Sequence, residues 1–145
     1  MMPAFGFSVG DFIAAIGLIT KVIKALKDKC GAATEYQHLQ LELQALERTL
    51  RYLQSLQPTA SNREHVNAIR GMALTCQIPL QEFLDRMHKY EASLGPFSAL
   101  NRGSIKSIGR KSQWALFMSD EVAELRTVIG AKVLSINLLL ATHTS

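Results

Sequence analysis

Histidine and cysteine are the residue types in this 145-residue chain that could support metal binding or nucleophilic catalysis. The four histidines lie in separate segments among polar neighbours: His38, His65, His88 and His143. Zinc sites need ligands at short, paired spacings, so we expect exposed helix-surface histidines rather than a metal site. Cys30 and Cys76 also lack Cys-x-x-Cys or Cys/His spacing. Two unpaired cysteines predict a reducing cytoplasm, with no disulfide framework and no redox or zinc chemistry.

Catalytic sequence motifs are missing as well. The chain has no glycine-rich phosphate loop, no dinucleotide fingerprint, no His-Glu-x-x-His and no Gly-x-Ser-x-Gly. Cys76 falls on the apolar stripe of a predicted helix, where a buried thiol is the expected role. We therefore predict a protein that is not an enzyme, with no catalytic residue, no metal and no cofactor.

The composition predicts a folded, apolar and mildly basic domain. Hydrophobic residues make up 48% of the chain and charged residues 19%, with a formal net charge of +4. Sixteen lysines and arginines spread along the chain fall short of a nucleic-acid footprint, so no nucleic acid is expected as a partner. The longest uninterrupted apolar run, Phe12 to Ile19, is far shorter than the roughly 20 residues of a membrane span. We expect a soluble domain in the resting state.

The most unusual segment is the apolar N-terminus. Between Phe5 and Leu26, apolar side chains surround much of the predicted helix, which is more than one bundle face requires. Small residues recur at nearly every helical turn: Gly6, Gly10, Ala14 and Gly17. Such a ladder permits close helix packing, either against partners in a membrane or against two neighbours in a bundle. Asp11 would cost about 2.5–3.5 kcal/mol at membrane depth, which favours interfacial docking or oligomeric insertion over a lone span.

The positive charge is concentrated in one predicted loop. No acidic residue occurs between Glu91 and Asp120, and this stretch holds four basic residues: Arg102, Lys106, Arg110 and Lys111. A polybasic loop gains about 1 kcal/mol per residue near an anionic leaflet, so we predict an anionic-lipid patch there. A second basic strip follows the apolar segment, at Lys21, Lys24, Lys27 and Lys29. An ordinary solvated loop is the alternative interpretation.

Helical periodicity organises the whole chain. Apolar residues at spacings of three and four predict helices over about residues 8–29, from 34 to the break at 57–59, from 61 or 62 onward, and over about 111–141. Glycine, proline and serine predict a flexible loop over about residues 93–110. Because the other connections are short, we predict an all-α, up-and-down four-helix bundle with a hydrophobic N-terminal helix.

Two of the predicted helices contain signals for irregularity. Pro79 lies inside the apolar pattern of the third helix, where it removes one backbone hydrogen bond and predicts a kink near Gln77 and Ile78. Ser119 precedes Asp120 and Glu121 as a helix N-cap would, so the last helix is open to division there.

Four segments together resemble a known family. They are Phe5-Gly-Phe-Ser-Val-Gly-Asp-Phe12, Leu43-Gln-Ala-Leu-Glu47, Lys111-Ser-Gln-Trp-Ala-Leu-Phe-Met118 and Ser135-Ile-Asn-Leu-Leu-Leu140. Their order and spacing resemble the HeLo and HeLo-like N-terminal domains of fungal STAND (NLR-like) receptors, over nearly the whole chain. In that family a Trp-Ala motif opens the last helix of the bundle, and Trp114 and Ala115 occupy the matching positions.

The resemblance implies a cell-death execution domain, similar to the helical bundle of the mixed-lineage kinase domain-like necroptosis effector. It implies a cytoplasmic protein of the heterokaryon-incompatibility or innate-immunity type that oligomerises on activation and relocates to membranes with anionic lipids. Its membrane-targeting element would be the N-terminal helix, through Phe5, Phe7, Val9, Phe12, Ile13, Ile16 and Ile19.

The same resemblance predicts the domain organisation. We expect residues 1–145 to form a single helical-bundle domain, as the N-terminal part of a longer protein with a C-terminal regulatory or sensor domain. The chain departs from the family by containing no nucleotide-binding domain and no prion-forming repeat. The alternative function is a non-enzymatic adaptor, in which the first helix packs in the core and the bundle mediates protein interaction and oligomerisation.

Overall fold

The computed structural model describes the backbone of residues 9–30, 34–94 and 105–144, and their side chains except at 29–30, 35, 93–94, 105–113 and 143–144. Within these residues every regular element is a helix: α1 (Val9–Cys30), α2 (Thr34–Ser55), α3 (Arg63–Leu74), α4 (Gln77–Leu94) and α5 (Ile105–Thr144). The prediction of an all-helical bundle is confirmed.

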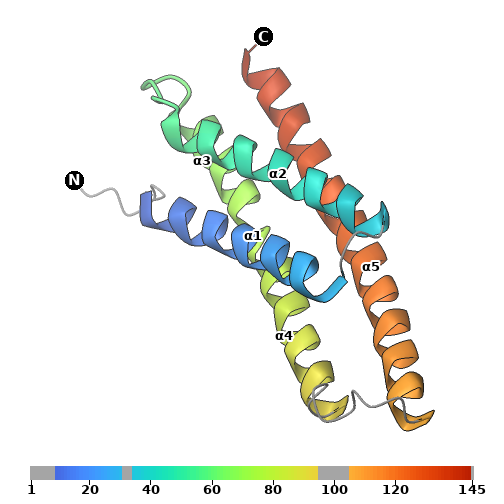
Figure 1. The fold of residues 1–145 in the computed structure, drawn as a ribbon. Coiled ribbons are helices and arrows are strands. Elements are labelled where there is room, and N and C mark those ends of the chain that lie inside the picture. The colour runs from blue at the N-terminus through green and yellow to red at the C-terminus, as the bar shows by residue number, and fades with distance from the viewer. Residues whose placement is uncertain (1–8, 31–33, 95–104, 145) are drawn as a thin grey trace.

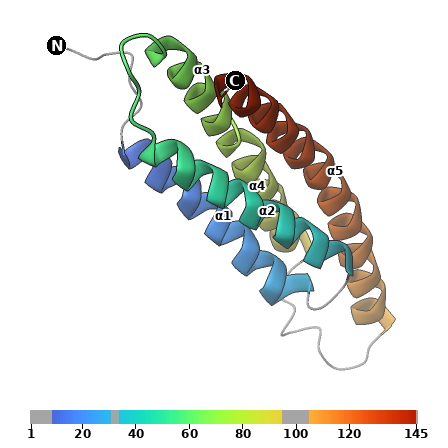
Figure 2. The ribbon, with the colours of Figure 1, turned by 90° about the horizontal axis from the view of Figure 1, so that it is seen from above.

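The helices pack as two antiparallel pairs that cross each other. Helices α1 and α2 form one pair, and α5 runs alongside α3 and α4, which follow one another as a nearly continuous rod (Figure 1). Helix α2 contacts both α1 and α5, and α1 closes the bundle against α3 and α4. Seen from above, α5 covers the side of α2 that α1 leaves free (Figure 2). Each pair therefore buries one apolar face against the other.

The core consists of the apolar stripes that the sequence periodicity defines. The leucine seam of α2 is fully buried, at Leu39, Leu43, Leu46, Leu50 and Leu53. From α1 the buried side chains are Phe12, Ala15, Ile19, Val22 and Leu26, and from α5 they include Met118, Val122, Leu125, Ile129 and Ile136. Spacings of three and four place these residues on one face of each helix, so their burial supplies most of the stability of the bundle.

The expected kinked third helix is instead divided into α3 and α4. Pro79 cannot donate to the carbonyl of Thr75, and its ring crowds that carbonyl, four residues earlier. The amide of Ile78 hydrogen-bonds to the Thr75 carbonyl at 3.2 Å, and the amide of Cys76 to that of Ala73 at 3.2 Å. These three-residue spacings break the α-helical pattern at residues 75–76, before the expected bend at residues 77–78.

Helix α5 is longer than predicted and includes part of the segment expected to be a flexible loop. The loop was expected over residues 93–110, but residues 93–94 end α4 and residues 105–110 form the first turns of α5. The division considered at Ser119 does not occur, because buried Met118 and Val122 continue one apolar stripe across it. Glycines in this segment lower helix propensity without preventing a helix, which explains the misplaced boundary.

Candidate membrane-facing surface

The outer face of α1 is mainly apolar along its first half, beside exposed Asp11, and mainly basic along its second, where Asp28 is also exposed. Val9 and Ile13 are exposed at 58% and 62%, and Gly10 and Ala14 lie exposed beside them. Further along, three exposed lysines follow on the same helix, at Lys21, Lys24 and Lys27. We call the exposed residues Val9, Gly10, Ile13 and Ala14, with these three lysines, the α1 outer surface. Apolar side chains followed by lysines are typical of helices that lie at a membrane interface.

The predicted membrane-targeting residues divide between this surface and the core. Val9 and Ile13 are exposed, whereas Phe12 and Ile19 are buried at 1% and 0% and Ile16 is half-buried. Phe5 and Phe7 lie outside the described residues. In this conformation Phe12 and Ile19 hold α1 in the bundle, so they are unavailable to a membrane unless the helix is released.

The small-residue ladder does not serve packing inside this bundle. Gly10 and Ala14 are exposed, and a Cβ built on Gly17 would meet no atom within 4 Å. Gly6 lies outside the described residues. Close packing of α1 against two neighbours in the bundle therefore does not explain these residues, and the face they form is open to an external partner.

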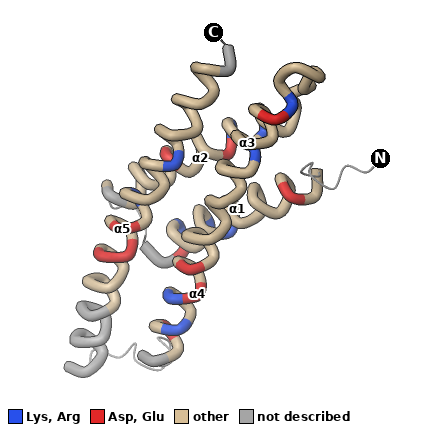
Figure 3. The backbone as a smooth tube through the Cα atoms, turned by 180° about the vertical axis from the view of Figure 1, so that it is seen from behind, with Lys and Arg blue, Asp and Glu red and all other residues tan. Residues whose placement is uncertain are grey.

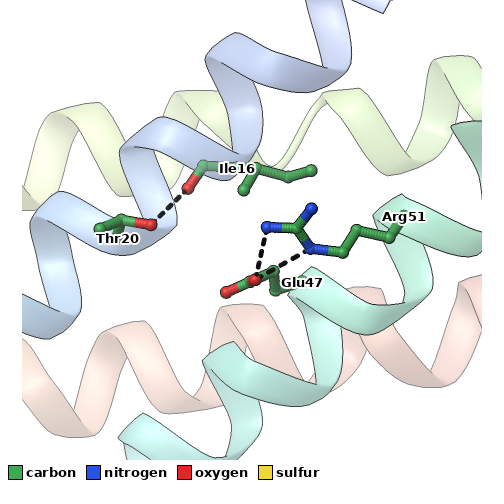
Figure 4. A network of polar contacts seen from close by, with 4 residues as sticks. All are labelled: Ile16, Thr20, Glu47 and Arg51. Atoms are coloured by element: carbon green, nitrogen blue, oxygen red, sulfur yellow. Dashed lines mark hydrogen bonds and ion pairs between the residues drawn. The ribbon is translucent and has the colours of Figure 1, made fainter.

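Two polar contacts, one within α1 and one within α2, lie where the two helices face one another. The hydroxyl of Thr20 donates to the carbonyl of Ile16 at 3.1 Å, within α1. On α2, Arg51 pairs with Glu47 at 3.0 Å, and the two sites face one another in Figure 4. Because the Arg51 side chain is 61% exposed, the pair contributes little stability, and it marks a hydrated edge of the apolar surface.

The lysines of α1 stand beside a shallow hollow between α1 and α4. The hollow has a volume of about 280 Å³ and is lined by Lys21, Lys24, Ala25, Asp28, Leu84, Met87 and His88. Two ammonium groups against the one carboxylate of Asp28 leave its rim with a net positive charge, which favours an anionic group such as a phosphate. The predicted lipid patch is less fully described: Arg102 lies outside the described residues, and Lys106, Arg110 and Lys111 are placed by backbone alone, in the first turns of α5.

The Trp-Ala motif lies at the contact between α4 and α5. Trp114 is half-buried and its ring centroid is 6.0 Å from those of both Tyr90 and Phe117. Tyr90 and Phe117 stack at 4.0 Å with an interplanar angle of 3°. Ala115 is exposed. Trp114 therefore acts here as a packing residue that joins the two helices near the end of the bundle.

A groove between α2 and α5 was not predicted from the sequence. It has a volume of about 500 Å³ and is lined by Glu42 of α2 and by Ala123, Arg126, Thr127, Gly130 and Ala131 of α5. The Nε atom of Arg126 lies 3.2 Å from Oε1 of Glu42 and forms one wall. The signal in the sequence was the run of small residues in α5, but only the packing of α2 beside it turns that run into a groove.

Helix α5 is also long and apolar enough to cross a membrane. Over Trp114–Thr142 its mean hydropathy reaches 1.4, and only 17% of the scored window is buried. In this structure α5 also supplies core residues such as Val122 and Ile129, while Leu116, Leu134 and Leu138 are more than 60% exposed. This finding rests on the length and composition of the helix alone. In this structure α5 lies along the bundle (Figure 1).

Within the described part of the chain, no group of three or more His, Cys, Asp or Glu residues is placed to hold a metal ion. Cys76 is fully buried in the core beside the division between α3 and α4. Burial raises the pKa of its thiol from 9.0 to about 11, although Lys132 partly opposes the shift. Since the thiolate is the nucleophilic form, this residue is structural and unreactive at neutral pH.

The raised pKa of Cys76 predicts alkaline destabilisation. Between about pH 9 and pH 11 the unfolded chain loses the thiol proton while the folded chain keeps it, so this contribution is complete below pH 9 and is lost toward pH 11. We expect the free energy of unfolding to fall by about 2 kcal/mol over this pH range. Urea unfolding at pH 7.5 and pH 10.5 measures it, with Cys76→Ala as the control for other titrating groups. Equal pH dependence in both proteins would contradict the assignment.

No family model, no curated protein and no solved structure matches the chain.

Proposed function

We propose that this protein is a regulated membrane-targeting effector domain that docks on anionic membranes through the α1 outer surface. The observation that supports it best is the division of this surface into an apolar half and a basic half. Val9 and Ile13 would enter the interface between head groups and acyl chains, and Lys21, Lys24 and Lys27 would contact lipid phosphates. The resemblance to HeLo-like domains supports a cell-death role of the incompatibility or immune type.

The proposal includes activation by release of α1. Gly10 and Gly17 each cost about 0.5–1 kcal/mol relative to alanine inside a helix, so α1 depends on packing for its stability. Detachment would expose Phe12 and Ile19 and allow several copies to assemble at the membrane. The fold that goes with this proposal is an up-and-down four-helix bundle in which α3 and α4 together count as one interrupted helix, controlled by a C-terminal regulatory domain.

Vesicle binding tests the docking step. We expect the protein to co-sediment with vesicles of phosphatidylcholine containing 30% phosphatidylserine and to bind pure phosphatidylcholine at least tenfold more weakly, because three lysines lose their anionic partners. Ile13→Glu should reduce binding to the anionic vesicles about tenfold or more, since it puts a carboxylate into the apolar half of the surface. Leakage of an enclosed dye measures whether docking leads to permeabilisation.

Leu41→Glu is the matched control for Ile13→Glu. Leu41 lies on α2, is 63% exposed against 62% for Ile13, and receives the same charge change. Both variants should keep the far-ultraviolet circular dichroism of the wild type because both positions are exposed. If Ile13→Glu binds anionic vesicles as well as Leu41→Glu does, the α1 outer surface is not the docking surface.

The second candidate function is the protein-interaction adaptor, which the α2–α5 groove and the exposed leucines of α5 favour. An adaptor would assemble with other proteins and remain indifferent to lipid. Stable assemblies together with no binding to vesicles at any phosphatidylserine content would favour this function over membrane docking.

A further inference from the structure

The outward face of α5 is uncharged over most of its length, and among the described residues no other helix packs on it. Leu116, Leu134 and Leu138 are 69%, 61% and 61% exposed, and Ala123 and Thr127 are exposed between them. At 100° per residue, these positions with Asp120 and Ala131 fall within one stripe about 80° wide. The opposite side of the helix holds the buried core residues. We call this stripe the α5 outer stripe.

The α5 outer stripe is symmetric about Thr127. Ala123 and Ala131 lie four residues to either side of Thr127. Leu116 and Leu138 lie eleven residues to either side of it. An antiparallel pair of identical helices with a two-fold axis at Thr127 would therefore place each alanine opposite an alanine and each outer leucine opposite a leucine. Isologous interfaces require self-complementarity of this kind.

The size pattern of the stripe suits the same arrangement. Small side chains at Ala123, Thr127 and Ala131 let two helices approach closely at the centre, while leucines cover the ends of the contact. The groove of about 500 Å³ between α2 and α5 lies at this centre, lined by Ala123, Thr127, Gly130 and Ala131. The hollow of one molecule thus lies where the helix of the other would pack.

Charge along α5 selects an antiparallel second copy over a parallel one. Between Trp114 and Glu124 the helix carries three acidic residues and no basic one, and from residue 125 to 142 it carries Arg126 and Lys132 with no acidic one. In Figure 3 the acidic positions of the described part of α5 all lie in its first half. Glu121, Arg126 and Lys132 each contact another helix of their own molecule, so the charge on the α5 outer stripe is that of Asp120. Antiparallel packing places Asp120 opposite Leu134 of the other copy, whereas parallel packing would place two Asp120 carboxylates opposite one another.

We propose that two copies of this chain form a symmetric dimer by antiparallel packing of their α5 outer stripes, centred on Thr127. This interface uses a different helix from the α1 outer surface, so it stands or falls independently of membrane binding. The proposed interface contains no residue of α1, which packs against α2 on the side away from α5 (Figure 2).

Sedimentation equilibrium over about 5–200 µM tests the dimer. The wild type should shift from the chain mass to twice that mass across this range, and Ala131→Arg should weaken the dimer at least tenfold, because a long charged side chain would replace a small one where Ala131 packs closely against Ala123 of the other copy. Ala68→Arg, at an exposed alanine of α3, is the matched control and should dimerise as the wild type does. A wild type that stays monomeric throughout, or a dimer insensitive to Ala131→Arg, would overturn the proposal.

Single cysteines test the register without relying on a disruptive charge. In a Cys30→Ser background, with Cys76 buried, Thr127→Cys should form a disulfide between copies because it lies on the two-fold axis. Leu138→Cys should not cross-link with itself but should cross-link with Leu116→Cys when the two proteins are mixed. A Leu138→Cys disulfide homodimer would indicate parallel packing and overturn the antiparallel arrangement.

Discussion

Replacing Phe12 with alanine should lower the free energy of unfolding by about 3–5 kcal/mol, the largest effect expected of a single substitution in α1. Phe12 is 1% exposed and is one of the largest fully buried side chains in the core. Removing its ring sacrifices the burial of a large apolar surface and leaves a cavity among residues that cannot all collapse into it. Since domains of this size have only about 5–15 kcal/mol of stability, the variant should unfold at a much lower urea concentration.

Ile13→Ala is the control for Phe12→Ala, because Ile13 is the next residue along the helix and is 62% exposed. Its effect on stability should stay within about 0.5 kcal/mol. In vesicle binding the order of the two effects should reverse. Folded Phe12→Ala should dock as the wild type does because its α1 outer surface is unchanged, and Ile13→Ala should bind more weakly. A small destabilisation by Phe12→Ala would mean that α1 is not packed in the core as described.

Replacing Arg70 with alanine should lower the free energy of unfolding by about 3 kcal/mol. Arg70 of α3 donates from Nε to the carbonyl of Leu53 at 3.0 Å and from Nη2 to the carbonyl of Leu56 at 2.8 Å. These carbonyls lie at the C-terminal end of α2, where few backbone donors remain and a positive charge is favourable, although the Leu53 carbonyl also accepts the Leu56 amide at 3.4 Å. The variant would leave both acceptors without this donor.

Desolvation by burial lowers the pKa of Arg70, yet the guanidinium remains charged at any pH where the protein is folded. Arg70→Lys should recover only part of the lost stability, because a single ammonium cannot reproduce the planar fork. Arg48→Ala, at an exposed position of α2, should change stability by no more than about 0.5 kcal/mol. Chemical denaturation of the three variants measures these differences, and equal effects of Arg70→Ala and Arg48→Ala would exclude the capping role.

The core could be predicted from the sequence because periodicity and burial are directly connected. Apolar spacings of three and four identified the α2 seam of Leu39 to Leu53, all of which is buried at those spacings. The same reasoning placed Cys76 on an apolar helical stripe, and Cys76 is fully buried. Helix starts at Val9, Thr34 and Arg63 lie within one or two residues of their predicted positions.

Features that depend on the competition between local and tertiary preferences could not be predicted. Pro79 signalled an irregularity, but the exact hydrogen bonds that divide α3 from α4 depend on how residues 75–76 pack. Glycines and serines between residues 103 and 110 indicated a loop, yet residues 105–110 are helical as the start of a helix held by α4. Arg70 had no recognisable signal, since its acceptors are 14 and 17 residues away.

By itself, the sequence determined which side chains are apolar, in what period they recur and where the first three helices begin, because these follow from residue type and local spacing. Only the tertiary structure decided that Phe12 and Ile19 face the core while Val9 and Ile13 face outward. The reason is that the neighbouring helices determine which face of an apolar helix is buried. The groove beside Arg126 also required α2 and α5 to lie side by side. The sequence defines the residue types on each surface, but only the tertiary structure shows which of these residues are exposed to a partner.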